Sequence, residues 1–318
     1  MLFAIQPAFR RVRITVAMTG NASWRRARAM RIVLLAFVAA AAFICTSSGA
    51  SARSARAAAH HGTVSVLYAG SLEDVMNKRI APAFLRATGY TLNGYPAGSS
   101  DLASEIKGKV RRGDVFISAS PKVDATLQGA KNGSWVSWYA PFAGTKLVLG
   151  YNRNSRFAAD LKHRAWYRVI TMPGFHLGFT DPKLDPKGVL TVKALSLAAK
   201  QHHDPALKQV AASQSDLFPE QDLVGRLQAG QLDAGFFYTV EASAAKIPTV
   251  SLGSINESAT YTITTLRNAP DTAGGQAFVK FLLSSEGERL LKSAGLTRVS
   301  PVARGRGVPS QLSAVIRR

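Results

Sequence analysis

The sequence predicts an α/β fold in which a mostly parallel sheet is flanked by helices. Short apolar segments typical of buried strands recur along the chain, beginning with residues 64–67. Runs with apolar residues at helical spacing alternate with them, and the first carries Leu72, Met76, Ile80 and Phe84. Strands that alternate with helices at this rhythm are typical of parallel sheets, in which ligands bind beyond the carboxyl ends of the strands.

The expected elements follow one another in a regular order. The first helical run is expected to divide at Pro82 and to stop at Thr88-Gly89, because proline and glycine interrupt helices. The other expected strands cover residues 90–93, 114–118, 146–151, 176–180, 233–238 and 261–266. The other expected helices cover residues 102–106, 189–200, 222–229 and 241–246, with a pair over 274–294 that is broken near Ser284.

Two Gly-Ser loops mark the starts of the first two helices. Ser71 follows Ala69-Gly70 and is followed three residues later by Asp74, which is a helix-start pattern. The same design recurs at residues 96–100, where Ser99 precedes the second helix. A strand that ends in a small-residue loop and opens a helix directs free N–H groups to one point, which suits an anion. The alternative is that Ser71 only caps its helix.

The first 59 residues are predicted to be an export signal and N-terminal extension. Four arginines within residues 25–31 precede an apolar run at 32–44 that is too short to span a membrane comfortably. Small-residue cleavage options follow at 50–52 and 57–59. We expect a cleaved signal and a periplasmic protein, with an uncleaved anchor as the alternative. Cleavage removes Cys45, the only cysteine, so no disulfide is expected.

The charge of the chain is strongly positive but dispersed. The formal charge is +21, and nine of the forty basic residues precede His60. The remaining 31 basic and 19 acidic residues leave +12 on the mature chain, which has roughly 260 residues and room for one large or two smaller domains. Scattered lysines and arginines are typical of a solvated surface, so no nucleic-acid partner is expected.

Five segments in a fixed order carry a family resemblance. They are AGSL at 69–72, AGSSDLASEI at 97–106, DVFISAS at 114–120, LGFTDPKLDPKG at 177–188 and GQLDAGFFY at 230–238. Together they resemble the periplasmic molybdate/tungstate-binding proteins of ABC importers, a class of two-lobed solute receptors. The resemblance implies a lobe one of residues 62–144 plus 253–300 and a lobe two of residues 145–252. The Arg-rich, Pro-containing segment 301–318 is expected to be a loose basic tail.

The resemblance also implies the ligand-binding residues. Ser71 and Ser99 match the serines that two N-terminal loops give to the oxyanion, and Asp185 matches a contributor from the Asp-Pro loop. Gln221 matches a main-chain N–H donor, and Tyr238 matches a hydroxyl donor. A fully deprotonated tetrahedral oxyanion offers only acceptors, so a site made of donors suits it.

Asp185 departs from a simple donor role. In the archaeal-type branch, an acid here and a glutamate on the following strand bind the metal of the oxyanion. The resemblance places that second acid at Phe237, which cannot coordinate, so we expect a plain tetrahedral oxyanion and an Asp185 that offers its N–H. The alternative is an Asp-Pro turn that only shapes the loop.

The predicted function is capture of molybdate or tungstate by a monomeric periplasmic receptor for a membrane permease. No catalytic residue, metal site or cofactor is expected, because no Gly-x-Ser-x-Gly elbow, His-Glu-x-x-His pair or phosphate-binding Gly-Lys-Ser/Thr occurs. The alternatives are a receptor for sulfate, thiosulfate or another oxyanion on the same fold, or an exported basic nucleic-acid-binding protein or enzyme.

Overall fold

Strand β1 (Gly62–Ala69) lies between β2 (Tyr90–Ala97) and β3 (Val115–Ser118) and runs parallel to both. The computed structural model describes residues 61–317, so the predicted export signal lies outside the described residues. Ala69 is paired with Ala97 in the register of β1 and β2. The two Gly-Ser loops therefore leave the sheet at the same edge and next to each other.

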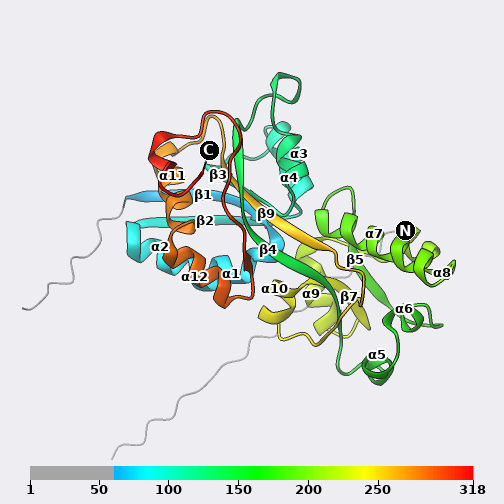
Figure 1. Ribbon diagram of the computed structural model, residues 1–318. Coiled ribbons are helices and arrows are strands. Elements are labelled where there is room, and N and C mark those ends of the chain that lie inside the picture. The colour runs from blue at the N-terminus through cyan, green and yellow to red at the C-terminus, as the bar shows by residue number, and fades with distance from the viewer. Residues whose placement is uncertain (1–60, 318) are drawn as a thin grey trace, which may run out of the picture. The chain divides into compact units, whose positions relative to one another are not determined.

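Two long strands connect the halves of the sheet. β4 (Trp138–Tyr151) pairs with β9 (Ser258–Thr265) along its first part and with β7 (Ala234–Tyr238) along its last part. The strand order is β2-β1-β3-β9-β4-β7-β5-β6, with β5 (Leu177–Thr180) and β6 (Leu217–Phe218) at the far end. Figure 1 shows β4 and β9 running together from one half into the other.

The remaining strands of each half run parallel. β5 is parallel to β6 and β7, as β1 is to β2 and β3, while β4 and β9 are antiparallel to their neighbours. This arrangement confirms the predicted two-lobed α/β fold. The predicted lobe boundary at Thr145 falls inside β4, and the exact division stays a prediction. Three short strands also pair with β4: β8 (Thr249–Val250), β10 (Thr297–Arg298) and β11 (Arg304–Gly305).

Helices cover both halves of the sheet. A 3₁₀ turn (Gly70–Leu72) and a π-helical turn (Met76–Ile80) flank α1 and precede α2, whose first turn contains Pro82. The helices of the first half are α1 (Glu73–Val75), α2 (Ala81–Thr88), α3 (Ser99–Lys107), α4 (Pro121–Ala125), α11 (Thr272–Leu282) and α12 (Ser285–Ser293). Those of the second half are α5 (Ala158–His163), α6 (Trp166–Val169), α7 (Pro186–Gln201), α8 (Ala206–Ala212), α9 (Glu220–Gln228) and α10 (Thr239–Ala244).

Helix boundaries agree with several sequence signals. The expected pair over 274–294 is confirmed as α11 and α12, and Ser284 caps α12 by accepting a hydrogen bond from Gly287 N. α9 starts at Glu220, two residues before the predicted start. That difference matters for the site, because it places a carboxylate at the first position of the helix. No helix within residues 61–317 is both long enough and apolar enough to cross a membrane.

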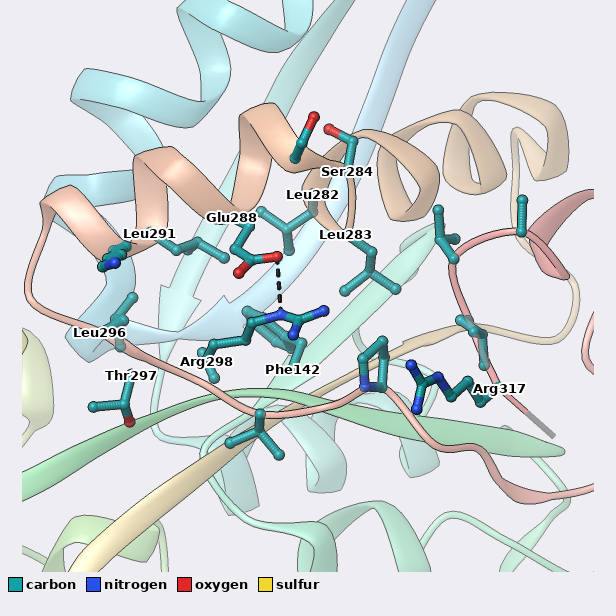
Figure 2. A pocket seen from close by; sticks show the side chains of 18 of the residues that line it. Phe142, Leu282, Leu283, Ser284, Glu288, Leu291, Leu296, Thr297, Arg298 and Arg317 are labelled. Carbon is teal, nitrogen blue, oxygen red and sulfur yellow. Dashed lines mark ion pairs between the residues drawn. The ribbon is translucent and has the colours of Figure 1, made fainter.

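The C-terminal segment is packed, which corrects the expected loose tail. Leu312 and Ile316 are buried, and Arg317 N donates to Pro301 O at 2.9 Å. The segment carries enough apolar side chains to cover the first half, so burial holds it in place. Together with α12 and β10 it encloses a cavity of about 390 Å³, in which Arg298 pairs with Glu288 at 2.9 Å (Figure 2).

Candidate functional site

The Ser71 loop presents its donors at the carboxyl end of β1. The Ser71 hydroxyl lies 2.7 Å from the Tyr261 hydroxyl and is buried. No side chain caps the 3₁₀ turn that contains Ser71, so this hydroxyl is not a helix cap. The sequence pattern that favoured capping therefore identified a helix start correctly but assigned the wrong partner to the serine hydroxyl.

The Ser99 loop meets the Asp-Pro loop of the second half. The buried Ser99 hydroxyl accepts a hydrogen bond from Ala119 N at 3.0 Å. The carbonyl oxygen of Leu184 accepts from both Ser100 N and Asp101 N, each at 3.0 Å. A Cβ at Gly98 would lie 2.5 Å from that carbonyl oxygen, so only glycine allows this approach. The start of α3 is thus bound by a loop from the opposite half of the sheet.

Asp185 and Tyr238 bring unpaired polar atoms to the same region. Asp185 caps α7 by accepting from Lys187 N at 3.1 Å, while its second carboxylate oxygen has no hydrogen-bond partner. Its own N–H donates to Asp181 O at 2.9 Å, so the expectation that this N–H is free for the anion is wrong. The hydroxyl of Tyr238, at the end of β7, is buried and also has none. Buried polar atoms without partners are costly and rare, so they indicate a place where a ligand completes the hydrogen bonding.

Gln221 is the second residue of α9. Its side chain is exposed and reaches Pro96 O at 3.4 Å. At this position of a helix the backbone N–H has no intrahelical acceptor, which is the donor that the family resemblance implies. Gly98, Thr180, Asp185 and Gln221 line one cavity of about 250 Å³. None of the five predicted ligand residues lines the cavity of Figure 2.

Glu220, which no sequence pattern indicated as a site residue, also lines the cavity that Asp185 and Gln221 share. Its two carboxylate oxygens accept from Gly70 N and Ser71 N, each at 3.0 Å. The sequence predicts that these N–H groups bind an anion. In the structure they bind the carboxylate of Glu220, which comes from the second half. An acid at a helix start is an ordinary feature and gave no signal by itself.

The sequence led us to expect Asp185 to be the only acid of the site, because Phe237 stands where the resemblance places a second acid. Glu220 corrects this expectation. Phe237 lies in an apolar cluster with Leu223 and Leu227, while its neighbour Tyr238 belongs to a different cluster. Adjacent strand residues point to opposite faces, so no acid at position 237 could join Tyr238. A second carboxyl group lines the cavity beside Asp185, that of Glu220 at the start of α9.

A buried ion-pair cluster surrounds Glu220. The ammonium of Lys187 lies 2.7 Å and 3.0 Å from the two carboxylate oxygens of Glu241 and 3.3 Å from Glu220. Burial, together with the charge of Asp185, raises the pKa of Glu220 to about 8. Burial also raises the pKa of Asp185 and that of Glu241. Burial alone would lower the pKa of Lys187, but Glu241, Glu220 and Asp185 raise it.

Comparison with known proteins shows the family of the chain. The model of the bacterial extracellular solute-binding protein family matches residues 64–297. The chain belongs to this family. A putative ABC transporter molybdenum-binding protein of Haloferax volcanii is 30% identical over 263 residues, which is 75% of this chain and 83% of that protein.

Two solved structures of solute-binding proteins share the fold. The periplasmic molybdate-binding protein of Azotobacter vinelandii is 20% identical, with a TM-score of 0.59 over 74% of this chain and 98% of that chain. The sulfate-binding protein SubI of Mycobacterium tuberculosis is 14% identical, with a TM-score of 0.58 over 76% of this chain and 88% of that chain. At these identities the likeness concerns the fold alone.

The structure brings the five predicted ligand residues of this solute-binding protein together only in part. Asp185 and Gln221 line one cavity, Ser71 and Gln221 line another, and Ser99 and Tyr238 line neither. Ser71 is linked through Tyr261 to Tyr238, whose ring centroid is 6.3 Å from that of Tyr261. Ser99 follows Gly98, whose ideal Cβ would lie 3.2 Å from Asp185 Cβ. The sequence predicts only that Tyr261 lies in a strand. Nothing in its local sequence indicates that its hydroxyl contacts Ser71.

Proposed function

We propose that the protein is a periplasmic receptor that captures molybdate or tungstate for the permease of an ABC importer. The observation that carries this proposal is that the N–H groups of Gly70 and Ser71 both bind a carboxylate, that of Glu220, which shows that this loop binds an anionic group. The buried Tyr238 hydroxyl, which has no hydrogen-bond partner, offers a further donor. Hydroxyl and N–H donors suit a tetrahedral anion that only accepts hydrogen bonds. The Haloferax relative, described as molybdenum-binding, favours molybdenum among the oxyanions.

The proposed mechanism is capture without chemistry. Ser71 and Ser99 hold the anion from the first half, and Asp185, the Gln221 N–H and the Tyr238 hydroxyl close on it from the second. The permease then recognises the closed, loaded form. An anion oxygen that binds Gly70 N and Ser71 N displaces the Glu220 carboxylate from them. The receptor acts as a monomer, needs no cofactor and binds no nucleic acid in this proposal.

Because Asp185 and Glu220 line the same cavity, the metal of the oxyanion has two possible coordination modes: four oxygens of its own, or six with the two carboxylates. Both carboxyl groups line the cavity of about 250 Å³, so they could add two oxygens to the four of molybdate. X-ray absorption of the molybdate complex separates the two modes by the number of Mo–O distances. Four equal distances mean a plain tetrahedral anion, and six mean that both carboxylates coordinate.

The test of the proposed function is thermal melting with millimolar molybdate, tungstate, sulfate, thiosulfate or phosphate. A ligand at about a hundred times its dissociation constant stabilises the folded state by roughly 2.7 kcal/mol, which raises Tm by a few degrees for a chain of this size. We expect molybdate and tungstate alone to raise it. A rise with sulfate or thiosulfate instead would keep the fold and change the ligand, as the SubI likeness allows. No rise with any anion would refute the proposal.

A further inference from the structure

Lys187 is a fully buried lysine beside the proposed anion site. It is the second residue of α7 and has no exposed side-chain area. Its ammonium donates hydrogen bonds to both carboxylate oxygens of Glu241 and lies 3.3 Å from a carboxylate oxygen of Glu220. Lysine is almost never fully buried unless it is paired, so these carboxylates are what keeps it in the interior.

The contact with Glu220 connects this ammonium to the anion-binding donors. A purely structural ion pair between α7 and α10 would need only Glu241. Glu220 instead bridges from Lys187 to Gly70 N and Ser71 N in the opposite half. A single carboxylate, that of Glu220, therefore connects the Lys187 ammonium to the N–H groups that bind the anion in the proposed function.

The charge balance of the site depends on Lys187. Asp185, Glu220 and Glu241 supply three carboxyl groups. Among residues 61–317, Lys187 is the only cation that forms ion pairs with Glu220 and Glu241, and its charge also acts on Asp185. Charges interact strongly in a buried, weakly screened site. Each unbalanced carboxylate thus repels a doubly charged anion about twice as strongly as a singly charged anion of the same shape.

We propose that Lys187 determines the charge of the oxyanion that the site accepts, by neutralising the Glu220–Glu241 pair so that a dianion can bind. This inference rests on the proposed function, and it goes beyond that function by assigning a specificity role to a residue outside the predicted ligand contacts. Lys187 positions and balances Glu220, and it does not itself need to touch the anion.

Tungstate and perrhenate provide the test, because both are tetrahedral oxyanions of heavy metals but carry two and one negative charges. The dissociation constants of both anions are measured by calorimetry for the natural protein and for Lys187→Met. We expect Lys187→Met to weaken tungstate binding at least about tenfold more than perrhenate binding. The double variant Lys187→Met/Glu241→Gln removes one charge of each sign and should recover the tungstate preference.

A matched control lies in the same helix. Lys193 pairs with Glu257 near the surface, with 60% of its side chain exposed, so Lys193→Met should leave both affinities unchanged. If Lys187→Met weakens both anions equally and the double variant recovers nothing, Lys187 is only structural and the inference is wrong. A natural protein that binds neither anion refutes the proposed function itself, which is a different outcome.

A second variant covers the case in which Lys187→Met does not fold. Glu241→Gln keeps Lys187 paired with Glu220 and removes one negative charge from the cluster. It should strengthen tungstate binding relative to perrhenate binding. An unchanged ratio of the two affinities in Glu241→Gln would overturn the inference. Melting of each variant without anion shows whether it is folded before binding is compared.

Discussion

At the scale of single residues, the site is defined by polar atoms that the fold leaves without partners. Tyr238 and Tyr261 make the contrast clear, since both are fully buried tyrosines with neighbouring rings. The Tyr261 hydroxyl is hydrogen-bonded to Ser71, whereas the Tyr238 hydroxyl forms no hydrogen bond within residues 61–317. A buried hydroxyl of the first kind stabilises the fold, and one of the second kind weakens it unless a ligand binds.

The substitution Tyr238→Phe should therefore separate binding from stability. It removes an unpaired hydroxyl, so we expect the free energy of unfolding of the empty protein to stay the same or to rise by about 1 kcal/mol. Molybdate affinity should fall about tenfold, because a donor to the anion is lost. Calorimetric titration and urea denaturation measure the two effects.

The matched variant is Tyr261→Phe. It removes a hydroxyl that is hydrogen-bonded to Ser71 and should lower the stability of the empty protein by about 1 kcal/mol. If Tyr238→Phe destabilised the empty protein as much as Tyr261→Phe does, the Tyr238 hydroxyl would have a structural partner. Its assignment as a ligand donor would then be withdrawn.

At the scale of elements, the starts of helices α3, α7 and α9 carry the site. α3 begins against the Leu184 carbonyl oxygen, α7 begins with Asp185 as its cap, and α9 begins with Glu220. Helix starts offer free N–H groups and attract negative charge, which explains why carbonyl and carboxylate oxygens collect there. The close approach of α3 to the Asp-Pro loop depends on the missing side chain of Gly98.

Gly98→Ala tests this approach. The added Cβ would lie 2.5 Å from the Leu184 carbonyl oxygen, so the Asp-Pro loop must move away from α3. We expect a loss of about 1–3 kcal/mol of stability and weaker molybdate binding, because Asp185 moves with the loop. Urea denaturation and calorimetry measure both quantities.

Gly225→Ala is the control for Gly98→Ala. Gly225 lies inside α9, and no atom lies within 4 Å of its ideal Cβ. Alanine favours a helix interior over glycine, so this variant should gain about 0.5–1 kcal/mol. Equal effects of the two substitutions would show that the contact between α3 and the Asp-Pro loop does not constrain the protein.

At the scale of the whole molecule, buried acids make the stability of the protein depend on pH. Asp124 is fully buried and accepts from the Thr262 hydroxyl at 2.5 Å, while its other carboxylate oxygen has no partner. Burial raises its pKa from 3.8 to about 7. The group therefore binds its proton more tightly in the folded state than in the unfolded chain.

The sign of the pH effect follows from this preference. Between pH 4 and pH 7 the folded protein holds a proton on Asp124 that the unfolded chain has lost, so stability falls as the pH rises. Asp124 alone accounts for a decrease of up to about 4 kcal/mol over this range. Asp124→Asn should remove that decrease.

Denaturation curves at several pH values measure the effect as a difference between variants. The advantage of Asp124→Asn over the natural protein should grow from pH 4 to pH 8. A difference that stays constant over this range would mean that Asp124 is already ionised in the folded protein at pH 4. The buried, half-paired carboxyl would then have to be stabilised by contacts other than the Thr262 hydroxyl.

Local patterns in the sequence determined the order of strands and helices and the places where the site could form. Alternating apolar segments predict β1, β3, β5 and β7, because each buried strand needs apolar side chains whatever its neighbours are. Ser71 and Ser99 were found because a glycine-serine loop before a helix is a local signal. Asp185, Gln221 and Tyr238 were placed by family resemblance, and their binding roles stay predictions.

Only the tertiary structure decided which charged groups meet. Glu220 lies 149 residues from Ser71 along the chain, and Lys187 lies 54 residues from Glu241, yet each pair is in contact. No periodicity records such pairs, because the first depends on how β4 and β9 bring the two halves together and the second on how α7 and α10 lie within the second half. Tertiary packing also places Phe237 and Tyr238 in different apolar clusters and brings the Glu220 carboxyl group into the cavity of Asp185.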